Sequence, residues 1–213
     1  MGLFITFEGS EGSGKTTQIK KAGEYLKRKN ISFLITEEPG GTRLGNELRK
    51  ILLNKSSLHI NGKSELLLFA AARAQHVEEI IRPTLEDGKV VLCDRYSDAT
   101  IAYQSFGRGL DIDDVRWINN FATRFLTPDL TLLFDIPVDI GLKRAMKRIS
   151  RIVDLPVEDR FESEEIEFHK RVREGYHALI KSDPERFRTI DASRGIDDIH
   201  RDVCRYLDSI IGT

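Results

Sequence analysis

An eight-residue glycine-rich segment near the start of the chain constrains the fold more than any other feature. Residues 9–16 read Gly-Ser-Glu-Gly-Ser-Gly-Lys-Thr and satisfy the pattern G-x-x-x-x-G-K-[ST] at every position. The segment follows an apolar run, Leu3–Phe7, and opens a helical pattern at Lys15. Glycines let backbone N–H groups converge on a phosphate, and the helix N-terminus adds its positive dipole end. We therefore predict a strand, a phosphate-binding loop and a helix, with an ordinary glycine-rich turn as the alternative.

The rest of the chain alternates short apolar runs with helical patterns. The apolar runs are Leu3–Phe7, Ser32–Thr36, Val90–Cys93, Leu130–Ile136 and Phe187–Ile190. The helical patterns cover Lys15–Lys29, Thr42–Leu53, Ser64–Ile81, Asp111–Phe125, Val138–Arg148, Glu164–Lys181 and Gly195–Ile211. Continuous apolar strands are typical of a parallel sheet covered on both faces, and the alternation predicts an α/β fold with right-handed crossovers. Because we find no internal repeat and no linker, we predict one domain over residues 1–213.

Helical periodicity also predicts which apolar side chains share a face. In Thr42–Leu53 the shared face holds Leu44, Leu48, Ile51 and Leu52. In Ser64–Ile81 it holds Leu67, Ala71, Ala74 and Val77. Packing in the core and contact with a second copy of the chain explain these faces equally well.

Composition excludes several classes of protein. The 33 Lys and Arg balance 34 Asp and Glu, for a net charge of -1, which argues against a dedicated nucleic-acid surface. Cys93 and Cys204 are too few for a disulfide framework and are interpreted as buried thiols of a reducing compartment. We find no charged leader and no apolar run of membrane-spanning length, and no histidine lies at zinc-ligand spacing, so we expect a cytoplasmic protein without zinc.

A polar step, Asp94-Arg95, follows the apolar run Val90–Cys93 and narrows the class of enzyme. A GTPase would carry Asn-Lys-x-Asp, but the only Asn-Lys pair, Asn54-Lys55, lacks the Asp. A remodelling ATPase would usually end this strand in Asp-Glu, and a partitioning ATPase would carry an extra lysine early in the loop. An acid followed by a base suits transfer between two phosphates. Asp94 and Thr16 would hold Mg²⁺, and Arg95 would grip an acceptor phosphate, with a strand-end ion pair as the alternative.

Several short motifs, taken in order, resemble those of the thymidylate kinase family, whose members phosphorylate dTMP to dTDP with ATP. They are Phe7-Glu8-Gly9, Glu38-Pro39-Gly40-Gly41-Thr42, Leu68-Phe69-Ala70-Ala71-Ala72-Arg73, Asp94-Arg95-Tyr96, Ala102-Tyr103-Gln104, Phe134-Asp135-Ile136-Pro137 and Gly141-Leu142-Lys143-Arg144. The resemblance covers nearly the whole chain. It implies a P-loop NTPase fold with a five-stranded parallel sheet, helices on both faces and a mobile lid at about residues 143–162. It also implies ATP and dTMP as substrates, Mg²⁺ as cofactor and a homodimer.

The resemblance assigns roles to residues of this chain. The residues implied to bind ATP are Gly9, Ser10, Glu11, Gly12, Ser13, Gly14, Lys15, Thr16, Thr17 and Ala192. The residues implied to bind dTMP are Glu11, Glu38, Pro39, Arg49, Phe69, Arg73, Arg95, Thr100, Tyr103 and Gln104. Phe69 and Arg73 are four residues apart on one helix face, which would suit a ring stacked on a base beside a guanidinium. Core packing for Phe69 and a solvated charge for Arg49 remain the alternatives.

A basic stretch from Lys143 onward is interpreted as the lid. Some family members carry a basic residue within the phosphate-binding loop, where this chain has Gly12. The resemblance is therefore to the bacterial-type branch, in which lid arginines supply that charge. We expect at least one of the candidates to act on the transferring phosphoryl, beside the catalytic residues Lys15, Asp94 and Arg95. The candidates are Arg144, Arg148, Arg151 and Arg160. A solvated helix face is the alternative.

Two rival functions stay open. One is the same chemistry on another acceptor, such as dUMP or a deoxynucleoside. The other is a switch that binds ATP, changes partners and uses hydrolysis as a timer. No sequence feature favours the second.

Overall fold

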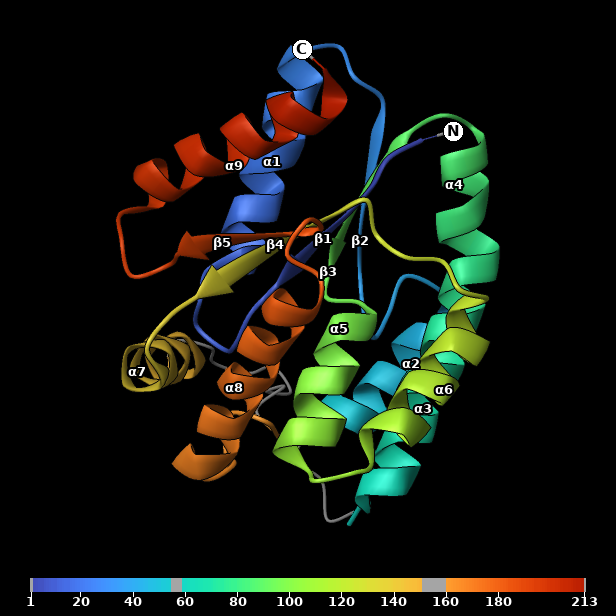
Figure 1. Ribbon diagram of the computed structural model, residues 1–213, viewed down its shortest axis with the longest axis vertical. Helices are drawn as coiled ribbons and strands as arrows, with labels where there is room; N and C mark the ends of the chain where they lie inside the picture. Colours follow the sequence, from blue (N-terminus) through green and yellow to red (C-terminus); the bar gives the residue numbers. More distant parts are fainter. Residues whose placement is uncertain (1, 55–58, 151–159, 213) are drawn as a thin grey trace.

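The computed structural model describes residues 2–54, 59–150 and 160–212. In them, one parallel sheet has the strand order β2-β3-β1-β4-β5 (Figure 1). Its strands are β1 (Phe4–Glu8), β2 (Phe33–Glu37), β3 (Val90–Asp94), β4 (Leu130–Asp135) and β5 (Phe187–Asp191). β1 is central, and Ile5 pairs with Leu92 of β3 on one side and Leu130 of β4 on the other. The predicted five-stranded parallel sheet is confirmed.

The helices also lie close to their predicted positions. They are α1 (Lys15–Arg28), α2 (Arg43–Leu53), α3 (Gly62–His76), α4 (Arg82–Glu86), α5 (Ser97–Thr100), α6 (Ile112–Thr123), α7 (Val138–Ile149), α8 (Ile166–Ser182) and α9 (Ile196–Ile211). Two π-helical turns, Val77–Ile81 and Ile101–Gly107, continue α3 and α5. Thr42 caps α2 by accepting a hydrogen bond from the backbone N–H of Gly45, as expected for a threonine at a helix start.

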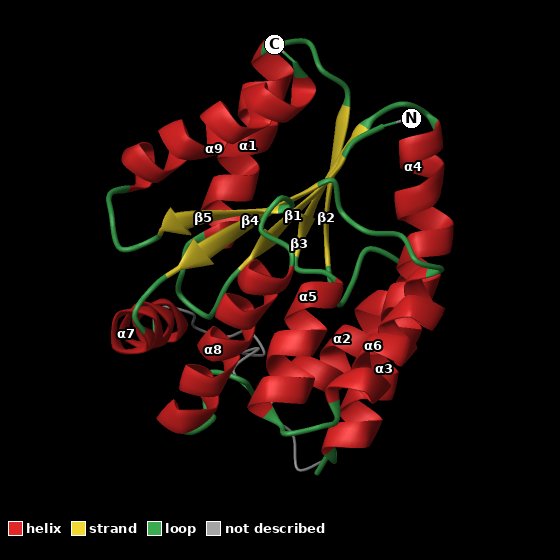
Figure 2. Cartoon of the chain, viewed as in Figure 1, coloured by secondary structure: helices red, strands yellow, loops and turns green. Residues whose placement is uncertain are grey.

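Helices cover both faces of the sheet (Figure 2). On one face, α1 and α9 pack against strand residues such as Phe7 and Leu132 and bury Leu26 and Val203 completely. On the other face, α5, the π-helical turn after it and α8 pack around Leu133, and α4 packs near Phe4. Each strand therefore has apolar side chains on both sides, which explains the continuous apolar runs in the sequence.

The long helix expected over Ser64–Ile81 is interrupted. Regular α-helix stops at His76, the turn Val77–Ile81 is π-helical, and α4 starts at Arg82. Pro83 has no N–H for the carbonyl one turn earlier, and its ring crowds that carbonyl. The backbone hydrogen bonds therefore change from α-helical to the wider π-helical spacing just before the proline.

Some apolar side chains predicted to share a helix face lie at the surface. Leu44, Ile51 and Leu67 are exposed, whereas Leu66 and Ala70 of α3 are buried. The buried side of α3 is thus displaced by about one residue from the predicted face, because α3 packs between α2 and α6.

The two cysteines differ in burial. Cys93 is buried as predicted, but Cys204 is partly exposed, which corrects the expectation that both are buried. Across residues 2–54, 59–150 and 160–212, every helix is too short or too polar to cross a membrane.

Candidate active site

The phosphate-binding loop joins β1 to α1 at the carboxyl edge of the sheet, and its own lysine folds back over it. The Lys15 ammonium donates hydrogen bonds to the carbonyl oxygens of Gly9 at 2.9 Å and Ser10 at 3.1 Å. Burial, together with repulsion from Arg95, lowers the pKa of Lys15 to about 8. The side chain therefore keeps its positive charge near neutral pH and lies where phosphate oxygens would enter the loop.

Close packing of α7 explains why residue 12 of the loop is glycine. Gly12 has a φ of 69°, and a Cβ there would lie 2.0 Å from the carbonyl oxygen of Gly141 in the first turn of α7. A side chain would have to displace that turn. The loop has no room for a basic side chain at this position, so positive charge for the phosphates has to come from elsewhere.

Thr16 and Asp94 form an oxygen pair suited to Mg²⁺. The Thr16 hydroxyl donates a hydrogen bond to Asp94 Oδ2 at 3.0 Å, which joins the start of α1 to the end of β3. The part of the chain that the structure describes holds no group of three or more His, Cys, Asp and Glu side chains placed for a metal. Mg²⁺ at a nucleotide site commonly uses one or two protein oxygens and takes the rest from phosphates and water. The pair fits that need.

A cavity of about 480 Å³ lies against the loop and gathers most of the predicted site. Its lining comes from the loop, the β2–α2 connection, α2, α3, the β3–α5 step, α5 with the π-helical turn after it, α7 and residues 160–162. Of the predicted site residues that the structure describes, those that do not line the cavity are Gly9, Ser10 and Ala192. Gly9 and Ser10 hold Lys15 through their carbonyl oxygens, and Arg151 lies outside the described residues. The substrate-sized space is thus continuous from the phosphate loop to the aromatic and arginine residues of α3.

Arg95 projects into this cavity from a strained position at the end of β3. Its φ is 69°, in the left-handed region that a non-glycine residue rarely adopts. Its guanidinium donates to Glu11 Oε1 at 3.0 Å and to the Tyr176 hydroxyl at 3.3 Å, and lies 4.8 Å from the centre of the Tyr103 ring. Strain at a cavity wall, held by several partners, is typical of a functional residue.

Glu11 reaches across from the phosphate loop to the same group. Its Oε1 accepts hydrogen bonds from the Tyr103 hydroxyl at 2.5 Å and from Arg95, and its Oε2 lies 3.4 Å from Nδ1 of His169. Burial alone would raise the pKa of Glu11, but His169, Arg95 and Tyr103 hold that pKa well below its usual range. Glu11 is therefore a carboxylate that fixes Arg95 and Tyr103 relative to the loop.

Arg73 is buried at the far end of the cavity and is held on several sides. Its Nε donates to Glu38 Oε2 at 2.7 Å, and its Nη1 donates to Thr100 Oγ1 at 2.9 Å and to Asn119 Oδ1 at 2.8 Å. Its Nη2 donates to the Tyr96 carbonyl oxygen at 3.1 Å. Four of five N–H groups are thus used within the described residues, which leaves one for a ligand. The side chain cannot swing away, so it offers a fixed donor.

His76 contacts the same carboxylate, Glu38, that binds Arg73. His76 is fully buried, and its ring bridges Glu38 Oε1 at 2.9 Å and Thr36 Oγ1 at 2.7 Å. Burial would raise the pKa of Glu38, but Arg73 and His76 lower it. Sequence reasoning gave His76 no role. Its position three residues after Arg73 on the same helix was a signal that both face the same partner.

The remaining acceptor-side residues line the cavity with different partners. Phe69 is half-buried and lies 6.2 Å, ring centre to ring centre, from Phe161. Arg49 lies against the β2–α2 connection, donating to the Pro39 carbonyl oxygen at 2.9 Å and pairing with Glu37 at 3.1 Å. Arg49 is therefore not the free solvated charge that its helix position also allowed.

The three described lid arginines all border the cavity, but each is docked on protein groups. Arg144 donates to the carbonyl oxygens of Ala192 at 2.8 Å and Ser193 at 3.1 Å. Arg148 pairs with Glu162 at 2.9 Å. The Arg148 side chain is 58% exposed, whereas that of Arg160 is 14% exposed.

Arg160 is held by an ion pair and by a backbone carbonyl oxygen. It pairs with buried Glu65 at 2.6 Å and donates to the Leu52 carbonyl oxygen. Gln104 also donates to Glu65, at 2.8 Å, so the Gln104 amide is turned toward this acidic group.

Two further buried residues, Glu8 and Tyr176, belong to the site and were missed from the sequence. Burial and the neighbouring Asp98 carboxylate raise the pKa of Glu8 to about 7. A carboxylate at the end of an otherwise apolar strand was a visible signal for Glu8. Tyr176 gave no such signal, because only the packing of α8 against the sheet brings it to Arg95.

A phosphate loop on a parallel sheet, an acid–base step on the neighbouring strand and a joined pocket for a second substrate define a nucleoside monophosphate kinase-type phosphotransferase. The profile of the family described as "Thymidylate kinase" matches residues 7–203. The chain belongs to the thymidylate kinase family.

Known members of the family are similar along nearly the whole chain. The thymidylate kinase of Syntrophus aciditrophicus is 54% identical over 208 residues, which cover 98% of this chain and 95% of the relative. That of Geotalea daltonii is 50% identical, covering 93% and 92%. The crystal structure of thymidylate kinase from Ehrlichia chaffeensis superposes with a TM-score of 0.75 at 34% identity and covers 97% of this chain and 98% of that one.

Proposed function

We propose that this chain transfers the γ-phosphoryl group of ATP to dTMP, giving ADP and dTDP in a step of dTTP synthesis. The observation that carries the proposal is the single cavity that runs from the phosphate loop to Arg73. Both substrates would meet in it, so the transfer would be direct and in line, without a covalent enzyme intermediate. Catalysis would then rest on positioning and on electrostatic stabilisation.

The donor side is the phosphate loop. Backbone N–H groups of residues 9–16 and the Lys15 ammonium would bind the phosphates of ATP. Thr16 and Asp94, joined at 3.0 Å, would hold Mg²⁺. The bound ion would neutralise charge on the phosphates. Ala192, whose carbonyl oxygen accepts from Arg144, lies in the β5–α9 connection expected beside the adenine.

The acceptor side begins at Arg95. Its guanidinium, whose planar fork matches phosphate oxygens, would hold the dTMP phosphate, and Arg49 would assist. Phe69 would stack on the base, and the remaining N–H of Arg73 would donate to a base oxygen. Tyr103, fixed by Glu11 at 2.5 Å, would border the sugar and disfavour a 2′-hydroxyl.

The lid would supply the charge that Gly12 cannot. Arg148 is the best-placed described candidate, because it borders the cavity, its side chain is 58% exposed, and the contact that holds it is an ion pair with Glu162. Arg144 would serve the ATP side through its contact with the β5–α9 connection. Arg160, paired with buried Glu65, would act mainly by holding the end of the lid in place.

We further propose that the whole chain is one kinase domain that works as a cytoplasmic homodimer. Exposed apolar side chains lie on three neighbouring helices, because α3 packs against both α2 and α6 (Figure 1). The cluster, called here the α6 face, consists of Leu44, Ile51, Leu67, Trp117 and Phe121. A helical face of this kind suits a twofold contact with a second copy of itself. Two free thiols fit a reducing compartment.

The test is ADP release from ATP and Mg²⁺ with dTMP, dUMP, dCMP, thymidine or the thymine ribonucleotide as acceptor. The proposal predicts strong preference for dTMP, and loss of transfer in Lys15→Ala with the fold retained by circular dichroism. Equal ADP release without acceptor would replace the proposal with an ATP-hydrolysing switch. Preference for another acceptor would leave the proposed phosphoryl transfer in place but exclude dTMP as the acceptor.

A further inference from the structure

Glu8, the last residue of β1, contacts the Arg95-Tyr96 step at its backbone. The side chain of Glu8 is fully buried, and its Oε1 accepts a hydrogen bond from the backbone N–H of Tyr96 at 2.7 Å. That N–H belongs to the peptide that directly follows the strained backbone of Arg95. A fully buried hydrogen bond at this point holds the chain in the unusual turn that aims Arg95 at the cavity.

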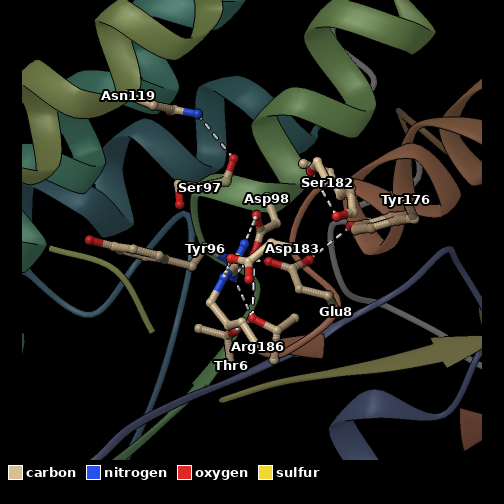
Figure 3. Close-up of polar contacts among 12 residues, drawn as sticks. Thr6, Glu8, Tyr96, Ser97, Asp98, Asn119, Tyr176, Ser182, Asp183 and Arg186 are labelled. Atoms are coloured by element: carbon tan, nitrogen blue, oxygen red, sulfur yellow. Dashed lines mark hydrogen bonds and ion pairs between the residues drawn. The ribbon is translucent and has the colours of Figure 1, made fainter. Parts of the chain in front are cut away.

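The other carboxylate oxygen of Glu8 reaches Arg95 through Tyr176 of α8. Figure 3 shows the Tyr176 hydroxyl directed at Glu8, and it donates to Oε2 at 2.8 Å. The same hydroxyl oxygen lies 3.3 Å from Arg95 Nη1 and accepts from it. With its proton committed to Glu8, the hydroxyl has only acceptor capacity left, so it can face only a donor such as the guanidinium.

A second ion pair fixes the segment just beyond Tyr96. Asp98, in the first turn of α5, pairs with Arg186 at 2.6 Å (Figure 3). Arg186 also donates to Thr131 of β4 at 2.7 Å. The start of α5 is therefore tied to the sheet independently of Glu8. Loss of the Tyr176 hydroxyl would leave the Arg95 guanidinium with its contacts to Glu11 and Tyr103 but without its partner at Nη1, and would not release the segment that follows.

We propose that Glu8 and Tyr176 form a positioning pair that holds the Arg95 guanidinium in place for the acceptor phosphate. The inference rests on the proposed role of Arg95 and adds two residues that act through it. A long arginine side chain has many rotamers, so fixing it beforehand favours binding and alignment of the phosphate. If Tyr176 only filled the core, its ring would suffice, and removing its hydroxyl would leave kcat and KM for dTMP unchanged.

The test is Tyr176→Phe, which keeps the ring and removes the hydroxyl. We expect kcat/KM for dTMP to fall about tenfold or more, as for one hydrogen bond to a charged group, while KM for ATP changes less than about twofold. The matched control is Tyr25→Phe, which removes a tyrosine–aspartate hydrogen bond of 2.7 Å between α1 and α9, away from the cavity. Tyr25→Phe should leave both constants unchanged.

A double-mutant cycle separates positioning from a general structural effect. The dTMP dissociation constant is measured by calorimetry for Tyr176→Phe, Arg95→Ala and the double variant. If Tyr176 acts through Arg95, its substitution should weaken binding about tenfold in the wild-type background and less than about twofold in Arg95→Ala. Equal losses in both backgrounds, equal rises in both KM values or unchanged dTMP kinetics in Tyr176→Phe would overturn the inference. Absence of dTMP phosphorylation by the wild-type chain would instead overturn the proposed function.

Discussion

At the scale of single residues, buried charges surround the cavity, and each is held by a specific partner. Glu38 shows this most clearly. Its side chain is 3% exposed and pairs with both Arg73 and His76. Such pairs contribute little net stability, yet removing one member leaves the other charge buried without compensation. Their value to this protein is the fixed orientation of Arg73.

Substitution of Glu38 by Ala should therefore destabilise the fold strongly. We expect the free energy of unfolding to fall by about 3–5 kcal/mol, because Arg73 would be left buried without its carboxylate. Urea denaturation measures the loss. Glu47→Ala, which breaks an exposed ion pair with Lys50 at 2.7 Å, is the control and should cost less than about 1 kcal/mol. A similarly small loss for Glu38→Ala would contradict this view of the network.

Glu8 makes stability depend on pH. Its pKa is raised from 4.5 to about 7, first by burial and then by Asp98, so between these values the folded state binds more protons than the unfolded state. Stability relative to Glu8→Gln should therefore be highest below about pH 4.5 and fall by roughly 3 kcal/mol as pH rises from about 4.5 through about 7. Urea denaturation of both proteins at several pH values measures the difference. A difference that stays constant with pH would refute the raised pKa.

At the scale of elements, the packing of α7 on the phosphate loop decides where catalytic charge is placed. The backbone contact between Gly12 and Gly141 closes the loop against α7. The same helix carries Arg144 and Arg148 to the cavity wall. One element thus both blocks a basic side chain in the loop and provides the arginines that replace it.

Gly12→Ala should therefore cost more than an ordinary glycine replacement. A Cβ would meet the Gly141 carbonyl oxygen at 2.0 Å, so we expect a loss of about 2 kcal/mol or more and weaker ATP binding. Gly88→Ala is the matched control, because Gly88 has a similar φ of 75° but no atom within 4 Å of the added Cβ. It should cost only about 1 kcal/mol. Thermal unfolding and calorimetric ATP titration measure both, and equal costs would exclude the steric account.

The elements themselves were largely predictable from sequence, and the failures have physical causes. Apolar runs and helical periodicity located every strand of the described sheet to within about two residues. The break after His76 was missed because Pro83 acts on the turn before it. Residues that one local motif predicts, such as Lys15 and Asp94, do line the cavity. Tyr176 was not, because its partners lie far away in sequence and meet only through tertiary packing.

At the scale of the whole molecule, the α6 face is a surface feature that the active site does not explain. Trp117 and Phe121 stack with ring centres 5.9 Å apart while 69% and 75% exposed. Isolated aromatic side chains at a surface are ordinary, but two stacked and exposed aromatic rings on one helix suit an interaction site. A twofold contact would bury these rings in both copies.

Trp117→Glu should therefore convert a dimer to a monomer. A charge at the centre of an apolar twofold contact would face its own copy and remain desolvated, so the mass by light scattering should fall by half. Ile196→Glu is the control, because Ile196 is a 57% exposed apolar residue at the start of α9. It should leave the mass unchanged. A wild-type chain that is already monomeric at micromolar concentration would overturn the dimer proposal.

The central claim is that one cavity holds both substrates for direct transfer. Rapid quench of the chain with ATP labelled in its γ-phosphoryl group, Mg²⁺ and dTMP tests it most directly, with dTDP, free phosphate and protein separated. The account predicts that label moves from ATP to dTDP in a one-to-one ratio with ADP, with none in the protein. Labelled protein during turnover, or label released as free phosphate, would contradict it.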